Sequence, residues 1–388
     1  MEFKKYKMEE VATFSQGKQV EIENQYPEKD ENMKRFLRII DFTNPNEPIR
    51  YVEDFGDRYY VTKDDLIMIR YGSQTCGKVV IGKEGIIANN MFKINLNNSL
   101  ILNRYAYYYL KQDIVYNYLR GSQNSSTMPS INFGILNKLE IEVPSIENQR
   151  KIIKILDDID KKIELNNEIN NNLYELAINY LKDKVESNKI TVSNFAKIQG
   201  GYAFKSKDFI DQYTNNRIIK IKNLRSEINA DVINSQFVEN EVVEKLDNKF
   251  RLKKGDVAIA MTGAELGKTG FIYGNDNYYL NQRVGTIRGK SKECELYLNI
   301  LFLSEEFQIL LNSKGYGSAQ PNVSTTDIEN ILISDITEEN LNEYYKIIKP
   351  IYYKIISNSE ELLNLEQLRD TLLPKLMNGE IDLDSIEV

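Results

Sequence analysis

The sequence predicts an α+β fold in which two duplicated mixed α/β domains are separated by two long α-helices that form an antiparallel coiled coil. Three observations support this prediction. Short motifs recur in the same order about 180–192 residues apart. Strand-like apolar segments and an amphipathic helix occur inside each copy, and a long helical stripe follows each copy.

Five pairs of short segments carry the repeat. Asp65–Gly82 (DLIMIRYGSQTCGKVVIG) resembles Gly255–Gly274 (GDVAIAMTGAELGKTGFIYG), which pairs Asp65 with Asp256 and Gly72 with Gly263. The other matches keep the same order: Phe14–Glu21 with Ile198–Lys205, Phe36–Asn44 with Arg217–Arg225, Ala88–Leu96 with Leu280–Gly289 (pairing Asn89 with Asn281), and Met128–Ile131 with Gln320–Val323. Five matches in one order indicate a duplication.

Inside each copy the apolar segments are short and rich in β-branched or aromatic residues. Gly, Asn and Ser clusters bound them, which predicts strands joined by turns. One amphipathic helix is predicted in each copy, over residues 103–119 and 295–311. The domains are predicted over residues 1–145 and 188–336, and the helical spacers over residues 146–187 and 337–388.

Apolar residues at three- and four-residue steps define one narrow stripe on each spacer helix. The stripes comprise Ile152, Leu156, Ile159, Ile163, Leu173, Leu176 and Tyr180 in the first helix, and Tyr345, Ile348, Tyr352, Ile355, Leu362, Leu365, Leu372 and Leu376 in the second. Matching stripes predict coiled-coil packing, and Asn166 and Asn170, which interrupt the first stripe, can fix register or partner choice. Pro350 is expected to break or kink the second helix.

The composition excludes several enzyme classes. The 388 residues include no histidine, which removes Ser-His-Asp and Cys-His triads, histidine-ligated zinc and histidine bases. The GxxxxGK[ST], GxGxxG and GxSxG motifs are absent, as are the FxGxG and [DN]PP[YF] motifs typical of DNA methyltransferases. Cys76 and Cys294 fit buried thiols in a reducing cytoplasm, and no signal peptide or membrane span is predicted.

The net charge of −7 argues against a uniformly basic nucleic-acid binder. Its distribution is more informative, because the acid excess lies in the two helical stretches and the two larger blocks are close to neutral. Acidic helices fit a protein–protein role better than DNA contact, since negative charge near phosphate is repulsive. Each neutral block can carry a basic face.

Two helix motifs resemble a known family. Val143–Leu156 (VPSIENQRKIIKIL) closely resembles the start of the central conserved helix in type I restriction-modification specificity subunits. Leu368–Leu383 (LRDTLLPKLMNGEIDL) resembles the end of the second conserved helix, and STMPSINFGIL and SAQPNVSTTDI resemble the segments that close the two target recognition domains. The resemblance spans the chain in order. The second helix start departs from it, because Ile336–Ile348 lacks the Gln149-Arg150 pair.

This resemblance implies a non-catalytic subunit. Each recognition domain would read one half of a bipartite target on double-stranded DNA, while the helices set the spacing and dock two modification (methyltransferase) subunits. Restriction (translocase and nuclease) subunits can then join. No cofactor is expected in this chain, whereas S-adenosylmethionine, ATP and Mg are implied for the partner subunits. Gln149, Arg150, Leu368 and Arg369 are the helix residues implied in partner binding, and the protein is expected in the cytoplasm without a membrane partner.

Side chains suited to reading base edges occur at matching points of the repeat, since Asn and Gln can pair with adenine, and Arg or Lys with guanine. The candidates are Ser73, Gln74, Thr75, Lys78, Asn89, Asn90, Ser122, Gln123 and Asn124 in the first domain, and Thr262, Glu265, Lys268, Asn281, Gln282, Arg283, Ser318, Gln320 and Asn322 in the second. Such residues are also common turn formers, so a purely structural role competes with DNA contact at each position.

Two other functions stay open from the sequence. A coiled-coil adaptor would use its globular domains to bind proteins, without DNA specificity. A stand-alone enzyme would need paired carboxylates and a divalent metal, and Asp65 and Asp256 are its candidates. The sequence leaves the DNA target and the gap between its halves undetermined.

Overall fold

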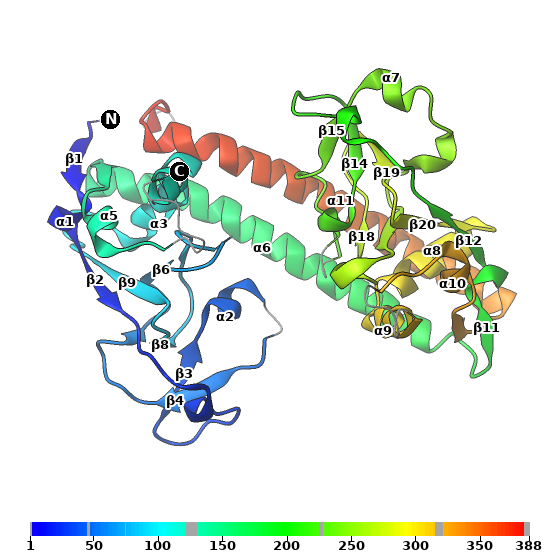
Figure 1. Cartoon of the computed structure of the whole chain (residues 1–388), viewed down its shortest axis with the longest axis horizontal. Coiled ribbons are helices and arrows are strands. Elements are labelled where there is room, and N and C mark those ends of the chain that lie inside the picture. The colour runs from blue at the N-terminus through cyan, green and yellow to red at the C-terminus, as the bar shows by residue number, and fades with distance from the viewer. Residues whose placement is uncertain are drawn as a thin grey trace. The chain divides into compact units, whose positions relative to one another are not determined.

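A computed structural model describes residues 2–44, 47–73, 75–121, 130–224, 228–314 and 321–383. The chain divides into two compact units (Figure 1). Unit 1 comprises residues 1–160 and 368–388, and unit 2 comprises residues 161–367. Within the described ranges, no helix combines the length and apolarity that crossing a membrane requires.

Unit 1 begins with a mixed domain of short elements. Its strands are β1 (Lys4–Lys7), β2 (Ala12–Gln16), β3 (Met33–Leu37), β4 (Arg50–Glu53), β5 (Tyr60–Val61), β6 (Leu66–Ile69), β7 (Val79–Val80), β8 (Gly85–Ile87), β9 (Met91–Leu96) and β10 (Glu140–Val143). Its helices are α1 (Met8–Val11), α2 (Ile39–Thr43), α3 (Asn103–Lys111), α4 (Asp113–Gly121), α5 (Phe133–Asn137) and the 3-10 helix η1 (Ile22–Asn24).

Unit 2 contains a second domain of the same kind. Its strands are β11 (Lys189–Thr191), β12 (Ala196–Gly200), β13 (Phe209–Ile210), β14 (Asn216–Ile219), β15 (Gln236–Val238), β16 (Arg251–Leu252), β17 (Val257–Ala260), β18 (Thr269–Phe271), β19 (Asn277–Leu280), β20 (Val284–Gly289) and β21 (Leu332–Ser334). Its helices are α7 (Asn240–Val243), α8 (Lys292–Phe302), α9 (Glu305–Lys314) and α10 (Thr325–Glu329), with 3-10 helices η2 (Val192–Asn194), η3 (Ser206–Asp208), η4 (Ile221–Asn223), η5 (Asn248–Phe250) and η6 (Gly263–Glu265).

The two domains share one sheet topology, which confirms the predicted duplication. The sheet β2-β9-β6-β7 of unit 1 corresponds to β12-β20-β17-β18 of unit 2, and β4-β3-β8-β5 corresponds to β15-β14-β19-β16. In both second sheets one parallel pair, β3–β8 or β14–β19, lies between antiparallel neighbours. Unit 2 adds β13 at the edge of its second sheet.

The first and last strands of each domain pair with each other. β1 pairs antiparallel with β10, and β11 pairs antiparallel with β21. A buried tyrosine secures each pair: the hydroxyl of Tyr105 on α3 donates to the Glu142 carbonyl at 2.8 Å, and the hydroxyl of Tyr297 on α8 donates to the Ser334 carbonyl at 3.0 Å. Each domain is therefore closed at the point where its chain enters a long helix.

The predicted helices over residues 103–119 and 295–311 are each broken into two, which corrects the expectation of single helices. Gln112 is buried with extended backbone between α3 and α4. Ser304 separates α8 from α9, and its hydroxyl accepts from the Phe307 amide at 3.2 Å, which caps the second helix. The helical spacing of apolar residues continues across each break, so the apolar pattern alone could not reveal the break.

Both predicted spacer helices are present as α6 (Ile146–Lys182) and α11 (Glu338–Met377). α11 continues through Pro350, so the expected break is absent, while the alternative of a kink at Pro350 stays a prediction. Pro350 and Lys346, whose carbonyl loses its backbone donor, are both exposed residues, so water can take the place of that donor. Proline is costly in a helix chiefly because it removes that hydrogen bond and crowds that carbonyl.

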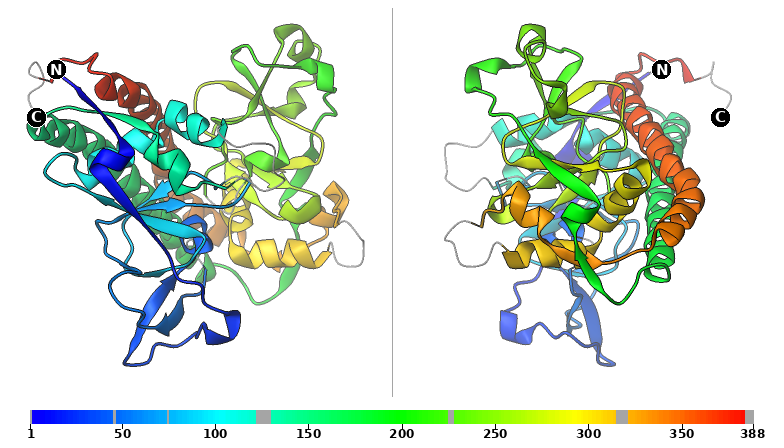
Figure 2. Two further views of the ribbon diagram at one scale, coloured as in Figure 1. Left: turned by 60° about the vertical axis from the view of Figure 1, so that its left-hand side comes forward. Right: turned by 90° about the vertical axis from the view of Figure 1, so that its right-hand side faces the viewer.

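Within unit 2, α6 and α11 lie side by side and run antiparallel (Figure 2). The amide nitrogen of Asn166 donates to Glu361 at 3.1 Å, and that of Asn170 donates to the Ser359 hydroxyl at 3.2 Å. Further along α6, the carbonyl of Ala177 accepts from the Tyr344 hydroxyl at 3.2 Å. In these three contacts the residue numbers rise along α6 and fall along α11. The two helices are therefore antiparallel, as predicted.

Within unit 1, the start of α6 packs with the end of α11. Ile152 and Leu156 share a core with Leu376 and Met377. A polar network continues the contact: Arg104, Asp157, Tyr108, Asp160 and Arg369 form a chain with contacts of 2.7–3.3 Å. Burial and then the neighbouring aspartates raise the pKa of Tyr108, which keeps its hydroxyl protonated as a donor.

The buried stripe of α6 departs from the sequence pattern at one point. Leu176 is 54% exposed, and Ala177 is the fully buried residue at this turn. Ala177 allows close approach of α11, as its bond to Tyr344 shows. A larger side chain at that position would separate the helices.

Gln149 fixes the first turn of α6. Its side chain is fully buried, and its amide nitrogen donates to the carbonyls of Leu100 and Pro144 at 2.8 and 3.0 Å. Its amide oxygen accepts from the Leu102 backbone at 2.8 Å. The turn is therefore tied to the loop that precedes α3. At the start of α11, Leu341 occupies the corresponding position and is buried without such bonds to make.

We expect Gln149→Leu to lower the free energy of unfolding of unit 1 by about 2–4 kcal/mol, because three buried backbone groups lose their partner. Arg150→Leu is the matched control, since Arg150 follows on the same helix and is exposed; its effect should stay within about 0.5 kcal/mol. Urea unfolding of the full chain measures both. Equal stability of the two variants would contradict this role of Gln149.

Candidate nucleic-acid interface

The turn between β6 and β7 presents several predicted residues of unit 1. Gly72 and Gly77 have φ values of +119° and +88°, which glycine adopts without strain. The Thr75 hydroxyl donates to the Tyr71 carbonyl at 3.0 Å, so Thr75 stabilises the turn. Ser73 and Lys78 are exposed and face solvent.

Backbone hydrogen bonds gather three separate segments beside this turn. The Arg70 amide donates to the Asn90 carbonyl at 2.8 Å, and the Ile131 amide donates to the Arg70 carbonyl at 3.0 Å. Tyr71 also forms an antiparallel bridge with Ser130. The β6–β7 turn, the β8–β9 turn with Asn89 and Asn90, and the segment after the Ser/Asn-rich loop therefore lie together.

Unit 2 repeats this arrangement bond for bond. The Met261 amide donates to the Arg283 carbonyl at 2.9 Å, and the Val323 amide donates to the Met261 carbonyl at 2.9 Å. Thr262 bridges Asn322 as Tyr71 bridges Ser130. In addition, Arg283 Nη1 donates to the Asn322 side-chain oxygen at 3.1 Å, which brings two predicted residues into direct contact.

The structure revises two pairings of the repeat. The Asn89 amide donates to the Lys18 carbonyl, and the Gln282 amide donates to the Tyr202 carbonyl, so Asn89 corresponds to Gln282 rather than to Asn281. Leu37 likewise corresponds to Ile219, one residue from the pairing that the letters suggested. Residue identity gave both sequence pairings an error of one position, because equivalence in a sheet is fixed by the hydrogen-bond register and not by residue identity.

The predicted residues differ in what they can offer a ligand. Asn89 and Asn90 are half-buried, and the Asn89 amide nitrogen donates to Gln19. Lys268 pairs with Glu265, whereas Gln282, Arg283 and Asn322 are exposed. Asn281 is half-buried. Six predicted residues lie outside the described ranges: Gln74, Ser122, Gln123, Asn124, Ser318 and Gln320.

Sequence analysis missed several basic residues that surround the unit 1 turns. Arg120 reaches back from α4, where Nη2 donates to the Ser73 carbonyl at 2.8 Å and Nη1 to the Tyr116 hydroxyl at 3.0 Å. The Arg70 guanidinium lies 4.8 Å from the ring centroid of Tyr71. Lys18 adjoins Asn89 through its backbone. The sequence could have indicated Arg70, because this arginine directly precedes Tyr71. No sequence pattern singled out Arg120 or Lys18.

The two candidate metal-binding aspartates have structural roles. Asp65 accepts from the Thr62 amide at 2.7 Å and from Lys93 Nζ at 2.8 Å. Burial alone would raise the pKa of Asp65, but these bonds outweigh it and hold the pKa below its ordinary value. Asp256 accepts from the Lys253 amide at 2.8 Å and from Arg288 at 2.7 Å. Each carboxylate caps the turn before a central strand.

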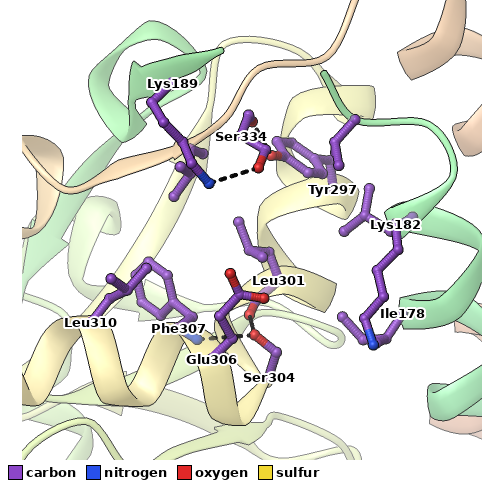
Figure 3. Close-up of a pocket in the computed structure, with 13 residues that line it drawn as sticks. Ile178, Lys182, Lys189, Tyr297, Leu301, Ser304, Glu306, Phe307, Leu310 and Ser334 are labelled. Atoms are coloured by element: carbon purple, nitrogen blue, oxygen red, sulfur yellow. Dashed lines mark hydrogen bonds between the residues drawn. The ribbon is translucent and has the colours of Figure 1, made fainter. Parts of the chain in front are cut away.

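No metal cluster is evident in the described part of the chain. No group of three or more Cys, Asp or Glu side chains there could hold a metal ion. A pocket of unit 2 between the end of α6 and the α8–α9 pair is lined largely by apolar side chains, including Leu301, Phe307 and Leu310 (Figure 3). Lys189 at its rim donates to Ser334 at 2.9 Å. This pocket contains none of the predicted reading residues.

The four residues implied in partner binding also differ in accessibility. Gln149 is fully buried in unit 1, so its side chain is committed to that unit. Arg150 is exposed, and Leu368 is 46% exposed. Arg369 donates to Asp160 at 3.3 Å and pairs with Asp370.

Comparison with known proteins decides the family. Residues 1–175 and 184–367 match the model of the type I restriction modification DNA specificity domain. The chain belongs to this family. The specificity subunit carries two copies of the domain, as its duplicated topology requires. The hypothesis of an adaptor without DNA specificity is therefore not supported.

Relatives and a solved structure agree with this assignment. The chain is 24% identical to the type I restriction enzyme MjaIX specificity subunit of Methanocaldococcus jannaschii over 337 residues, 80% of this chain and 76% of that protein. It is 23% identical to the MjaVIII specificity subunit of the same organism over 363 residues, 87% and 84% of the two chains. Its fold is similar to that of the type I restriction-modification S subunit from M. genitalium, with a TM-score of 0.54 and 18% identity over 97% of this chain and 96% of that chain.

Arg283 is strained in the specificity subunit, because its φ of +74° lies in the left-handed region that disfavours side chains. We expect Arg283→Gly to be more stable than Arg283→Ala by about 1 kcal/mol. The neighbouring Gln282 is the control, since its φ is not positive: there Gly should be less stable than Ala by about 0.5–1 kcal/mol. Urea unfolding of the four variants tests this. The same sign at both positions would refute the strain.

Proposed function

We propose that this specificity subunit reads a bipartite DNA target, with unit 1 recognising one half and unit 2 the other. The observation that carries the proposal is the repeated set of backbone bonds that gathers the same three segments in each unit. Exposed polar side chains there, above all Arg283 and Asn322, suit hydrogen bonding to base edges. The basic residues around the unit 1 turns suit phosphate contacts that position the protein.

The helices α6 and α11 are proposed to set the spacing of the half-sites and to dock two modification subunits. Asn166 and Asn170 hold the helix pair in one register, as a spacer requires. Leu165, Ile169 and Leu176 are 47%, 42% and 54% exposed on one side of α6, and their spacing of four and seven residues forms an apolar stripe. Such a stripe favours contact with another protein.

The chemistry is proposed to reside in the partner subunits. Asp65 and Asp256 are held by cations and turn amides of their own domains, which leaves them poorly placed to bind a divalent metal. Modification subunits would bind S-adenosylmethionine, and restriction subunits, where they join, would use ATP and Mg. This chain would supply the recognition of the DNA sequence and no catalytic group.

We expect replacements in one unit to alter only one half of the methylated sequence. In the full chain co-expressed with its modification subunit, Arg283→Gln with Asn322→Ala should relax the half read by unit 2, because the paired side chains are lost. Asn89→Ala with Asn90→Ala should relax the other half. Sequencing of methylated bases in the host genome reports both halves at once.

The matched control is Lys197→Gln, an exposed change on β12. It should leave the whole methylated sequence unaltered. Relaxation of both halves by one double variant would contradict the division of reading between the units. Methylation by the purified chain without a partner would contradict the proposed division of labour.

A further inference from the structure

A cation and an aromatic ring stand beside one turn in each unit, the β8–β9 turn with Asn89 in unit 1 and the β19–β20 turn with Gln282 in unit 2; these two are the reading turns. In unit 1 the Arg58 guanidinium lies 5.5 Å from the ring centroid of Tyr59, and the Lys18 ammonium lies 5.5 Å from the same ring. In unit 2 the Lys249 ammonium lies 5.1 Å from the ring centroid of Phe250. The Tyr202 ring lies 5.5 Å from Phe250, in the place of Lys18.

These residues occupy equivalent positions of the duplicated fold. Tyr59 immediately precedes β5, which pairs antiparallel with β8, and Phe250 immediately precedes β16, which pairs antiparallel with β19. The Lys18 amide donates to the Ile87 carbonyl at 2.8 Å, as the Tyr202 amide does to the Leu280 carbonyl at 3.0 Å. A cation followed by an aromatic residue therefore stands at one position in both domains, although the surrounding sequences differ.

In each unit one backbone hydrogen bond connects this group of cationic and aromatic residues to the reading turn. The Asn89 amide donates to the Lys18 carbonyl at 3.0 Å, and the Gln282 amide donates to the Tyr202 carbonyl at 2.7 Å. Arg58 and Lys249 are both exposed. Their charges are therefore accessible to a phosphate group near the neighbouring turn.

We propose that the two cation–aromatic pairs, Arg58–Tyr59 and Lys249–Phe250, bind the DNA sugar–phosphate backbone next to the base step that each turn reads. The inference rests on the proposed function and adds positioning residues that the reading turns do not include. The ring face attracts the neighbouring cation and restricts its side chain. A cation held in this way meets a phosphate with less loss of conformational freedom than a free lysine or arginine does.

The two units are unequal at this position. Unit 1 has a second cation, Lys18, held over Phe55 at 4.8 Å and Tyr59, whereas unit 2 has the 38% exposed ring of Tyr202. Lys249 also pairs with Asp247 at 3.3 Å, while Arg58 has no acidic partner among the residues that the structure describes. Unit 1 should therefore supply more of the salt-dependent part of DNA affinity.

The test measures DNA affinity of the full chain assembled with its modification subunits, as a function of salt. The probe is a fluorescently labelled DNA duplex that carries the methylated sequence. Its binding is measured by fluorescence anisotropy. Arg58→Gln and Lys18→Gln should each reduce the slope of log affinity against log salt by about one, as expected for one lost phosphate contact. Lys249→Gln should reduce it by less, because Asp247 already neutralises part of that charge. The methylated sequence should stay unchanged in all three.

Two further variants separate DNA contact from a structural role. Arg58→Lys keeps the charge and should restore the slope, while Tyr59→Leu should keep the slope and weaken affinity about two- to fivefold through loss of the cation–ring contact. Lys63→Gln is the control, since the exposed Lys63 precedes the Leu66 end of β6, whereas the β8–β9 turn adjoins the other end, where Ile69 pairs with Met91. Circular dichroism melting verifies that each variant folds.

Unchanged slopes in both Arg58→Gln and Lys18→Gln, with site-specific methylation intact, would overturn the inference and leave the proposed function standing. A changed methylated sequence in Arg58→Gln would also overturn it, because a backbone contact carries no base identity. Absence of any sequence-specific methylation with the unaltered chain would instead overturn the proposed function, and this inference with it.

Discussion

Backbone pairing among three distant loop segments is the constraint on which the candidate interface depends. In unit 1 the residue after β6 donates to Asn90 and accepts from Ile131, and Met261 does the same in unit 2 with Arg283 and Val323. A strand partner shifted by one residue would turn every side chain to the opposite face. These bonds therefore decide which polar residues face solvent and which stabilise the turn.

The same constraint explains how two domains of one topology can carry different side chains. Backbone bonds are indifferent to side-chain identity, so Tyr71 and Ser130 in one unit can be replaced by Thr262 and Asn322 in the other without loss of the bridge. The positions stay fixed while the chemistry varies. A scaffold of this kind suits a protein whose two domains must read different sequences with one geometry.

The register of the paired helices α6 and α11 is fixed by side chains, whereas the register of the loop segments is fixed by the backbone. Asn166, Asn170 and Ser359 replace apolar residues at the centre of the unit 2 pair. Asn170 Oδ1 and the Asn358 side-chain nitrogen are buried and have no hydrogen-bond partner among the residues that the structure describes, which costs about 1–3 kcal/mol for each group. A purely apolar seam would be more stable but would tolerate sliding, so this layer exchanges stability for a single register.

The sequence by itself determined the duplication and the order of domain and helix, because repeated motifs and helical periodicity are local patterns, while the motifs at residues 143–156 and 368–383 carried the resemblance to the family. It also indicated Asn166, Asn170 and the reading turns, since polar residues at fixed points of an apolar or glycine-rich pattern are visible in one dimension. Only the tertiary structure decided that Asn89 matches Gln282, that Gln149 faces inward, and that Arg120 and Lys18 join the interface. Those facts depend on hydrogen bonds between residues 47 to 80 positions apart in the chain, whose register no local pattern records.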